Sequence, residues 1–298
     1  MTTMKTTYST LALFILLCVA MPQQVAAQLD IPQKSPKANV ALRVGLTDVA
    51  IQYSSPAVRG RGIWGKLVPY DKVWRAGANE ATVVEFSTNV SIGGKSLPKG
   101  KYSLFLIPAK DGNWTAIFNK VWDQWGAYQY DQSKDELRIS VTAKNLSDIV
   151  ENLRYRITTK SVEHGMIVME WERKQITIPF ATDAINLTIK NVNEALKTAP
   201  EKDKWWINAE AAEFLVENNG DMDKALNYAN QSIQLKSCVR NYWVKAQILA
   251  KKQDMAGALA AADKALALSK KDEQEKEFYA SVKSQMDAAT QQWKKQKK

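Results

Sequence analysis

Cysteine and histidine are scarce in this chain, and their scarcity limits the chemistry that the protein can perform. The sequence of 298 residues contains two cysteines and one histidine. Cys18 falls in an apolar N-terminal run that is typical of a cleaved signal, which leaves Cys238 alone and excludes an intramolecular disulfide. Cys238 has no histidine nearby and lies in a segment of helical period, so we expect a small buried residue rather than a nucleophile.

The single histidine, His164, lies in the stretch "VEHGM", which is typical of a hairpin turn. One histidine excludes a zinc site built from several of them, and a Ser-His-Asp triad would have to use this turn residue. The sequence also lacks the CxxC and HExxH motifs and a Gly-rich phosphate loop that ends in Lys-Ser or Lys-Thr. We therefore expect no metal and no cofactor, and we assign no catalytic residue.

Long apolar runs are absent after the N-terminus. Residues 1–27 have the three parts of an export signal: a positive start at Lys5, an apolar run of about ten residues from Leu11 to Ala20, and the small residues Val25-Ala26-Ala27. The apolar run is too short for a membrane span, which needs about 20 residues. We expect an exported chain that keeps no transmembrane segment after cleavage.

A net charge of +10 at pH 7 raises the question of a nucleic-acid partner. The positive residues are spread along the chain, apart from a terminal cluster from Lys294 to Lys298 that is typical of a solvated tail. Export also fits poorly with nucleic-acid binding. We therefore expect no nucleic-acid partner.

Alternation of apolar and polar residues predicts β-strands from residue 39 to residue 181. The stretches "VALRVGL" and "LPKGKYSLFLIP" alternate with period two, and Gly93-Gly94 between short apolar runs is a strong hairpin signal. Roughly nine or ten short strands with close turns favour an antiparallel β-sandwich or open barrel. Alternating βα units are absent, which argues against a nucleotide-binding parallel sheet.

Helical period replaces alternation after residue 181. Residues 205–298 contain two helix-turn-helix stretches that repeat each other at an offset of 33 residues, close to the length of about 34 in a tetratricopeptide unit. The matching pairs are Asp221 and Asp254, Ala225 and Ala258, Leu226 and Leu259, and Ile233 and Leu266. A final helix would cap this tetratricopeptide-like module, and a generic bundle of helical hairpins is the alternative.

Together these patterns predict an α+β multidomain chain, with the β-sandwich or open barrel first and the helical hairpin module second. The boundaries between its parts follow from the changes of period. They are a signal peptide at 1–27, a flexible segment at 28–38, a β-sandwich domain at 39–181, a linker or docking helix at 182–204, and the helical module at 205–298.

Three blocks of the β-rich half resemble a known family. They are "YSSPAVRGRGIWGKLVPYDKVWRAGANEAT" (53–82), "LPKGKYSLFLIP" (97–108) and "WGAYQYD" (125–131). These long blocks are similar to the domain-of-unknown-function 2911 family, which is found mostly in exported proteins of Bacteroidetes-type bacteria and whose members also carry a helical tail. The resemblance implies an exported β-rich domain, in the periplasm or on the outer membrane or cell surface of a Gram-negative bacterium. It implies no activity and no catalytic residue.

The stretch "WRAGANE" (74–80) and the irregular segment before it supply the candidate ligand site. Long irregular segments between strands are often functional, and guanidinium groups, indole faces and an Asn-Glu pair suit a polar ligand. The candidate ligand-binding residues are Arg59, Arg61, Trp64, Trp74, Arg75, Asn79, Glu80 and Trp125. The alternative is a structural corner, in which Arg75 pairs with Glu80 or Glu85 and the two indoles of Trp64 and Trp74 cover one end of the sheet.

The stretch "VWDQWGAYQYD" (121–131) carries a second cluster of aromatic residues. Trp122, Trp125, Tyr128 and Tyr130 would form either a platform for stacking sugar rings or a hydrophobic cap beneath a loop. Gly126 and Ala127 suggest close packing and favour the cap. If this stretch meets "WRAGANE" in space, the ligand hypothesis gains support.

These observations lead to three functional hypotheses. The first is a non-enzymatic exported binding or scaffold protein, with a small polar or glycan ligand on the β domain and a protein partner on the helical module. The second is an exported hydrolase or glycan-active enzyme with a site around Arg59, Arg75, Asn79 and Glu80, which requires a raised pKa at Glu80. The third is a purely structural or assembly protein.

Overall fold

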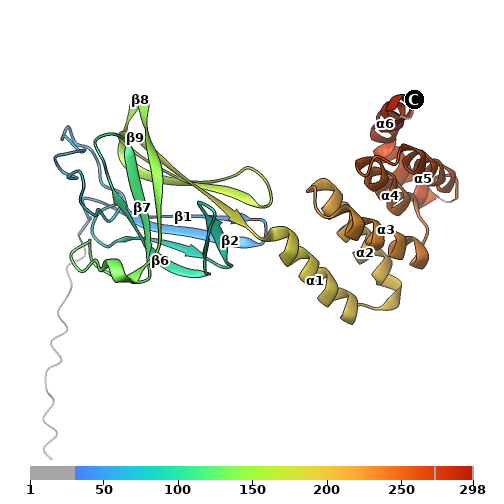
Figure 1. Ribbon diagram of the computed structural model, residues 1–298, viewed down its shortest axis with the longest axis horizontal. Coiled ribbons are helices and arrows are strands. Elements are labelled where there is room, and N and C mark those ends of the chain that lie inside the picture. The colour runs from blue at the N-terminus through green and yellow to red at the C-terminus, as the bar shows by residue number, and fades with distance from the viewer. Residues whose placement is uncertain (1–30, 272, 297–298) are drawn as a thin grey trace, which may run out of the picture. The chain divides into compact units, whose positions relative to one another are not determined.

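The computed structural model describes residues 31–271 and 273–296, and the predicted export signal at 1–27 lies outside this part of the chain. Nine strands come first and six α-helices follow in the described residues (Figure 1), which confirms the predicted α+β architecture. The strands are β1 (Lys37–Val44), β2 (Thr47–Ser54), β3 (Thr82–Phe86), β4 (Val90–Ile92), β5 (Lys95–Leu97), β6 (Gly100–Ile107), β7 (Asn113–Asn119), β8 (Asp135–Thr159) and β9 (His164–Thr182). β1 thus begins inside the segment that was predicted to be flexible.

The strands follow the order β1-β2-β3-β6-β7-β8-β9-β4-β5, and all neighbouring pairs are antiparallel. The first part of β8 pairs with β7, where Trp114 lies opposite Val141, and the second part pairs with β9, where Tyr155 lies opposite Met169. β8 therefore belongs to two sheets, and the sheet bends at this strand. The bend lets the inner faces of the two parts share one hydrophobic core.

The length of β8 is the main difference from the sequence prediction, which treats "ELRISVTA" and "LRYRITTK" as separate short strands. The structure joins them into one strand of 25 residues. Register shifts between Asn145 and Val150 and between Val150 and Arg154 interrupt its pairing with β9. Because Leu146, Ile149 and Val150 do not alternate with the polar residues of this stretch, its sequence does not indicate a strand although its backbone remains extended.

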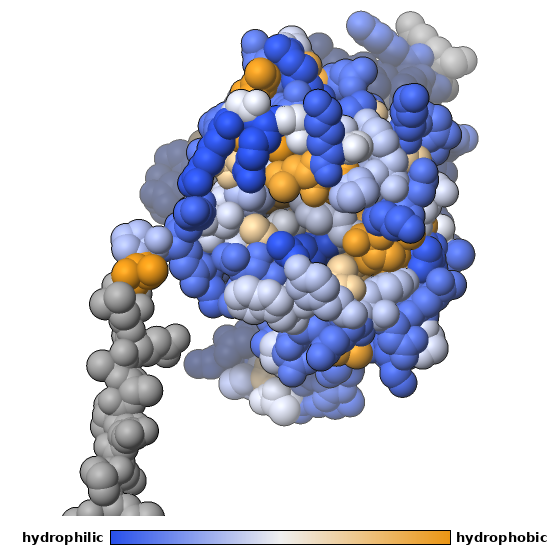
Figure 2. Space-filling view, turned by 90° about the vertical axis from the view of Figure 1, so that its left-hand side faces the viewer, coloured by the Kyte–Doolittle hydropathy of each residue, from blue (hydrophilic) through white to orange (hydrophobic). Residues whose placement is uncertain are grey.

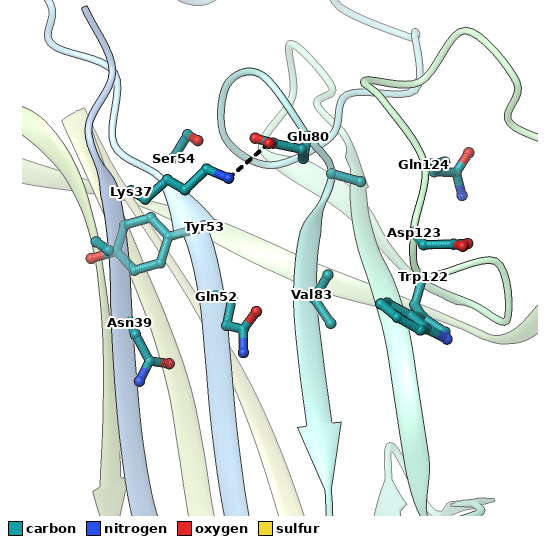
Figure 3. Close-up of a pocket in the computed structure, with 12 residues that line it drawn as sticks. Lys37, Asn39, Gln52, Tyr53, Ser54, Glu80, Val83, Trp122, Asp123 and Gln124 are labelled. Atoms are coloured by element: carbon teal, nitrogen blue, oxygen red, sulfur yellow. Dashed lines mark ion pairs between the residues drawn. The ribbon is translucent and has the colours of Figure 1, made fainter. Parts of the chain in front are cut away.

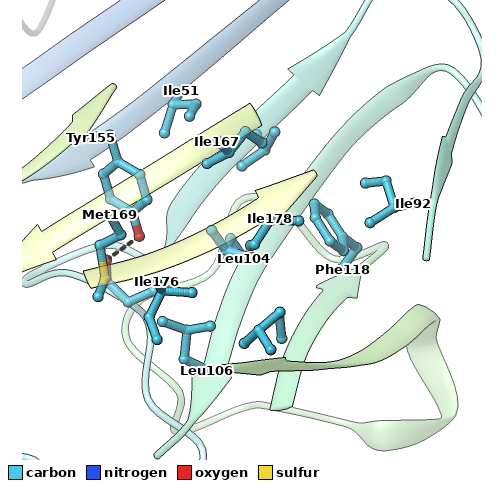
Figure 4. Close-up of a cluster of buried hydrophobic side chains, with 14 of the residues drawn as sticks. Ile51, Ile92, Leu104, Leu106, Phe118, Tyr155, Ile167, Met169, Ile176 and Ile178 are labelled. Carbon is cyan, nitrogen blue, oxygen red and sulfur yellow. Dashed lines mark hydrogen bonds between the residues drawn. The ribbon is translucent and has the colours of Figure 1, made fainter. Parts of the chain in front are cut away.

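Apolar side chains of alternate strand residues form the core of the β domain. Figure 4 shows Ile51 of β2, Leu104 of β6, Phe118 of β7 and Ile178 of β9 converging on this core, and each is at most 2% exposed. The short β4–β5 hairpin turns at Gly93 and Gly94, whose φ angles of 59° and 75° are those of a tight hairpin turn. The Gly-Gly signal in the sequence therefore predicted this turn correctly.

The helices are α1 (Ala184–Thr198), α2 (Glu201–Glu217), α3 (Met222–Leu235), α4 (Val239–Lys251), α5 (Met255–Leu268) and α6 (Glu273–Gln296). Repeated residues occupy equivalent places in the hairpins α2–α3 and α4–α5. Asp221 and Asp254 accept backbone hydrogen bonds at the N-termini of α3 and α5, and Ala225 and Ala258 are both fully buried. Within the described residues, none of the helices is both long enough and apolar enough to span a membrane.

Helices α1 and α6 extend the two hairpins. The apolar side of α1, which includes Ile189 and Val192, packs against the cluster that α2, α3 and α4 share. On α6, Trp293 lies 5.7 Å from Trp243 of α4, measured between ring centroids. The segment 182–204, predicted to be a linker or a docking helix, therefore contains a helix that packs on its helical neighbours.

Glu170 is a buried carboxylate on β9. Its side chain is 5% exposed and accepts hydrogen bonds from Arg154 (2.8 Å), Arg156 (2.9 Å) and Gln175 (2.7 Å). Burial alone would raise the pKa of Glu170, but the hydrogen bonds from Arg156, Gln175 and Arg154 outweigh burial and lower the pKa to about 2. The ionised carboxylate thus links the two longest strands, β8 and β9.

We predict that Glu170 makes folding stability depend on pH in the acid range. Because folding lowers its pKa from 4.5 to about 2, its contribution is complete above pH 4.5 and is lost as the pH falls towards 2. Urea unfolding of the parent and of Glu170→Gln should show a less stable variant at neutral pH and a difference that shrinks in acid. A difference that does not change with pH would contradict this role.

Candidate functional site

Residues 55–81, between β2 and β3, form no regular strand or helix, as the sequence predicts. Four residues of this segment other than glycine have a positive φ angle: Arg59 (50°), Asp71 (60°), Ala76 (51°) and Asn79 (56°). L-residues adopt this conformation at an energetic cost, so the surrounding contacts must hold the chain in place. Residues 55–81 are therefore held in one conformation by specific contacts, and we call this segment the corner.

The corner is held mainly at Ala76, which is fully buried. Its carbonyl oxygen accepts hydrogen bonds from Tyr155 Oη (2.8 Å) and Thr82 Oγ1 (3.0 Å). Burial raises the pKa of Tyr155, so its hydroxyl stays protonated and remains a donor. The next residue is glycine because a Cβ atom at Gly77 would lie 2.8 Å from Thr82 Oγ1 and 3.2 Å from the carbonyl oxygen of Ser54.

Trp64 and Trp74, two of the predicted ligand residues, pack against the core of the β domain. Trp64 lies 4.7 Å from Trp114 and 5.7 Å from Trp171 between ring centroids, and Trp74 stacks on Trp171 at 5.7 Å. Trp114 and Trp171 are each 1% exposed. This four-tryptophan cluster agrees with the structural alternative, in which the two indoles cover one end of the sheet.

The predicted arginines are engaged with the protein backbone or lie within the corner. Arg61 donates to the carbonyl oxygens of Val58 and Ala57, and Arg59 donates to that of Lys34. Arg75 has a buried Nε with no hydrogen-bond partner among the described residues, and its Nη1 would lie 2.8 Å from a Cβ atom at Gly126. In the described residues, Arg75 forms no ion pair with Glu80 or Glu85, which instead pair with Lys37 and Lys101.

The two stretches singled out in the sequence meet in space. The backbone N–H of Ala81 donates to Gln124 (3.0 Å), and that of Gly126 donates to Asn79 (3.1 Å). Glu80 and Trp125 face each other across the same short backbone bridge. The loop therefore runs directly beside the end of "WRAGANE", which is the condition that favours a ligand site.

A pocket of about 500 Å³ opens beside this junction (Figure 3). Its floor is the outer face of three neighbouring strands, where Asn39 of β1, Gln52 of β2 and Val83 of β3 lie side by side in register. The loop after β7 forms a wall that includes Trp122 and Gln124. We call this cavity the ligand pocket, and Glu80 is the one predicted site residue that lines it.

Glu80 and Lys37 close one end of the ligand pocket with an ion pair of 3.0 Å. Burial raises the pKa of Glu80, but hydrogen bonds from its own backbone N–H and from Lys37 outweigh burial and lower the pKa. Asp123 is a second carboxylate in the lining. In the ligand pocket, Lys37 thus pairs with Glu80, and the amide groups of Asn39 and Gln52 form most of the polar floor.

Trp122 and Gln124, in the wall of the ligand pocket, differ in what they offer a ligand. Trp122 is 44% exposed, and Lys101 Nζ lies 4.9 Å from its ring centroid. Gln124 is 5% exposed; its Nε2 donates to Val121, while its buried Oε1 has no hydrogen-bond partner in the described chain. A buried acceptor without a donor is costly, so this atom lowers the stability of the wall, and the exposed indole of Trp122 is the part of the wall suited to binding.

The aromatic stretch of residues 121–131 forms both a cap and an exposed rim. Tyr130 and Ala127 pack on Phe105 and Ile117, on the outer face of β6 and β7. Trp125 and Tyr128 are 58% and 82% exposed and do not line the ligand pocket. The cap therefore covers one half of this sheet face and leaves the face of β1–β3 open.

Cys238 and His164 lie outside the ligand pocket. Cys238 is 3% exposed, as expected for a small buried residue, and burial raises the pKa of its thiol. His164 is exposed at the start of β9, where its Nδ1 lies 3.0 Å from Ser161 Oγ. Among residues 31–271 and 273–296, no three histidine, cysteine, aspartate or glutamate side chains lie close enough to hold a metal ion.

Most residues of the ligand pocket were missed by the sequence analysis. Lys37, Asn39 and Gln52 are outward-facing strand residues, and alternation marks them only as solvent-exposed. The aromatic stretch was the usable signal, because it identified Trp122 and the condition under which a ligand site is favoured. The register of β1, β2 and β3 brings Lys37, Asn39 and Gln52 into the pocket, and the sequence of a single strand does not predict this register.

Fold and site together define an antiparallel β domain with a polar surface pocket, followed by helical hairpins. Residues 35–180, which cover almost all of the β domain, match the model of a family described as "Protein of unknown function (DUF2911)". This match supports the resemblance seen in the sequence. No curated protein and no solved structure was found to match the chain.

We predict that Trp74 stabilises the fold whereas Arg61 contributes little to it. Trp74→Ala should lower the free energy of unfolding by about 3 kcal/mol because it opens a cavity in the four-tryptophan cluster. Arg61→Ala should change it by roughly 0.5 kcal/mol or less because this side chain is exposed. Urea unfolding monitored by tryptophan fluorescence and circular dichroism measures both, and a fully stable Trp74→Ala protein would argue against the structural role.

Proposed function

We propose that the chain is an exported, non-enzymatic binding protein whose β domain holds a neutral, hydroxyl-rich ligand such as a glycan in the ligand pocket. One observation carries this proposal: the amides of Asn39 and Gln52 on the floor and the exposed indole of Trp122 line the same pocket, with Val83 between them. Pockets for small ligands combine apolar or aromatic surface with a few polar groups that fix orientation. The ligand pocket has both elements on neighbouring strands and one loop.

The polar groups suit hydroxyls better than charged groups. The amides of Asn39 and Gln52 each offer donors and an acceptor to a ligand in the pocket. A sugar hydroxyl can donate and accept at once, so it satisfies such groups without a change of charge. The flat indole of Trp122 provides an apolar surface for the C–H face of a sugar ring.

The electrostatics of Glu80 favour binding over glycoside hydrolysis. A general acid must carry a proton near the working pH, which requires a raised pKa. The pKa of Glu80 is lowered, chiefly because its backbone hydrogen bond and Lys37 outweigh the effect of burial. An ionised Glu80 held by Lys37 instead acts as a fixed acceptor for ligand hydroxyls.

The face of the protein in Figure 2 does not favour a large apolar partner. Figure 2 shows small hydrophobic patches separated by hydrophilic residues on the face that it presents. Extensive apolar patches mark stable protein interfaces, whereas scattered hydrophobic residues are normal on a protein surface. This distribution supports a polar ligand at this end of the β domain.

The helical hairpins support a second part of the proposal, a tetratricopeptide-like module that binds a protein partner. Trp206 of α2 and Leu235 of α3 are 45% and 48% exposed, and Arg240 of α4 stacks on Trp206 with its guanidinium carbon 3.9 Å from the ring centroid. Tryptophan and arginine are frequent at the energetic centres of protein interfaces. The predicted export signal and the family resemblance support a location in the envelope of a Gram-negative bacterium.

We predict that Trp122→Ala and Gln52→Ala weaken glycan binding by at least tenfold, equivalent to about 1.4 kcal/mol, because each removes a contact in the ligand pocket. Isothermal titration of residues 28–298 with glycans selected on an array measures the effect. Both changes are at exposed positions, so the melting temperature should stay within a few degrees.

Tyr128→Ala is the matched control, since this aromatic side chain is exposed on the same loop but does not line the ligand pocket. Equal losses in Tyr128→Ala and Trp122→Ala would contradict the assignment of the site. Products released from a bound glycan by the parent, but not by Glu80→Gln, would instead favour the enzyme hypothesis.

A further inference from the structure

A second hollow of about 430 Å³ lies on the outer face of the same strands as the ligand pocket. Its lining includes Ala41 of β1, Ala50 of β2 and Glu85 of β3, which lie side by side in register. This row is two residues along the strands from the row of Asn39, Gln52 and Val83, a step of about 7 Å. The two hollows therefore follow each other along β1–β3, and we call them together the groove.

Small side chains keep the second hollow open. Ala41 and Ala50 present only methyl groups on the outer face, whereas the polar side chains of Arg43, Asp48 and Glu85 stand around them. The cap formed by residues 121–131 packs on β6 and β7 and leaves this part of the face uncovered. The result is a shallow floor with polar edges.

Lys101 of β6 joins the walls of the two hollows. Its Nζ lies 4.9 Å from the ring centroid of Trp122, which lines the ligand pocket, and 3.7 Å from Glu85 Oε2, which lines the second hollow. Lys101 thereby links one lining residue of each hollow.

Three ion pairs lie along the groove, and Asp123 is the lining carboxylate outside them. Lys37 pairs with Glu80 (3.0 Å), Arg43 with Asp48 (3.8 Å) and Lys101 with Glu85 (3.7 Å). Opposite charges this close leave little net field along the floor, which suits an uncharged polymer better than an acidic or basic one. Exposed ion pairs are also weak, so hydroxyl groups can hydrogen-bond to their free lone pairs and protons.

We infer that the groove binds a linear, uncharged oligosaccharide, with one part in the ligand pocket and the chain continuing over Ala41 and Ala50 into the second hollow. The inference rests on the proposed glycan-binding function and adds the length and direction of the ligand. A chain laid along the strands passes from the amide of Gln52 over Ala50 towards the polar edge at Glu85, while Asn39 and the indole of Trp122 lie to either side of it. A short ligand would use the first contacts alone.

The test measures affinity against chain length. Residues 28–298 are titrated with linear neutral ladders of glucose, mannose, xylose and N-acetylglucosamine units, from one to six units long. In the ladder that binds, affinity should rise at least tenfold between two units and four or more. Ala50→Gln fills the floor of the second hollow, so it should abolish this rise and leave affinity for the two-unit ligand unchanged.

Ser140→Gln, an exposed strand position on β8, is the matched control and should bind like the parent. Equal affinity for two-unit and longer ligands, or an unchanged rise in a folded Ala50→Gln protein, overturns the extended groove while the proposed function stands. Absence of binding at every length in all four ladders contradicts the proposed function and the extended groove together. Trp122→Ala separates the cases further, because it should weaken both short and long ligands.

Discussion

The carbonyl oxygen of Ala76 accepts hydrogen bonds from two buried hydroxyl groups, those of Tyr155 and Thr82, and the placement of the site depends on this interaction. The two bonds hold a left-handed backbone in the interior, where an unsatisfied carbonyl would be costly. They connect residues 55–81 to the second sheet through Tyr155 and to the start of β3 through Thr82. With Ala76 fixed, the direction of the chain through Asn79 and Glu80 is also fixed.

This direction explains how one corner serves both stability and recognition. The tryptophan side chains of the segment point into the core, whereas the backbone after Ala78 turns outward and bonds to residues 124–126. The loop held in this way covers β6 and β7 but stops before β3. The outer face of β1–β3 is therefore open, and Trp122 stands beside it, because the loop of residues 121–131 covers only β6 and β7.

The sequence predicted the two-part architecture because alternation and helical period are local properties of a chain. It also predicted the Gly93-Gly94 turn, whose positive φ angles only glycine adopts readily. It did not predict the single long β8, since residues 145–151 lack the alternation of a strand although their backbone is extended. Nor did it predict Lys37, Asn39 and Gln52 as pocket residues, because register across three strands brings them to Glu80 and Trp122. Its candidate set mixed side chains that pack inward, such as Trp64, with the one that faces the pocket.

The strand order also has a consequence for how the protein folds. β4 and β5 form a local hairpin, yet their partner in the sheet is β9, so that Val90 lies opposite Thr182. The second sheet therefore cannot close until nearly the whole β domain has been synthesised, and closing so long a loop slows folding. The helical hairpins make mostly short-range contacts, so each can form as soon as its own two helices have been synthesised. Two parts of one chain thus reach their native contacts on different timescales, with the second sheet of the β domain among the last features to form.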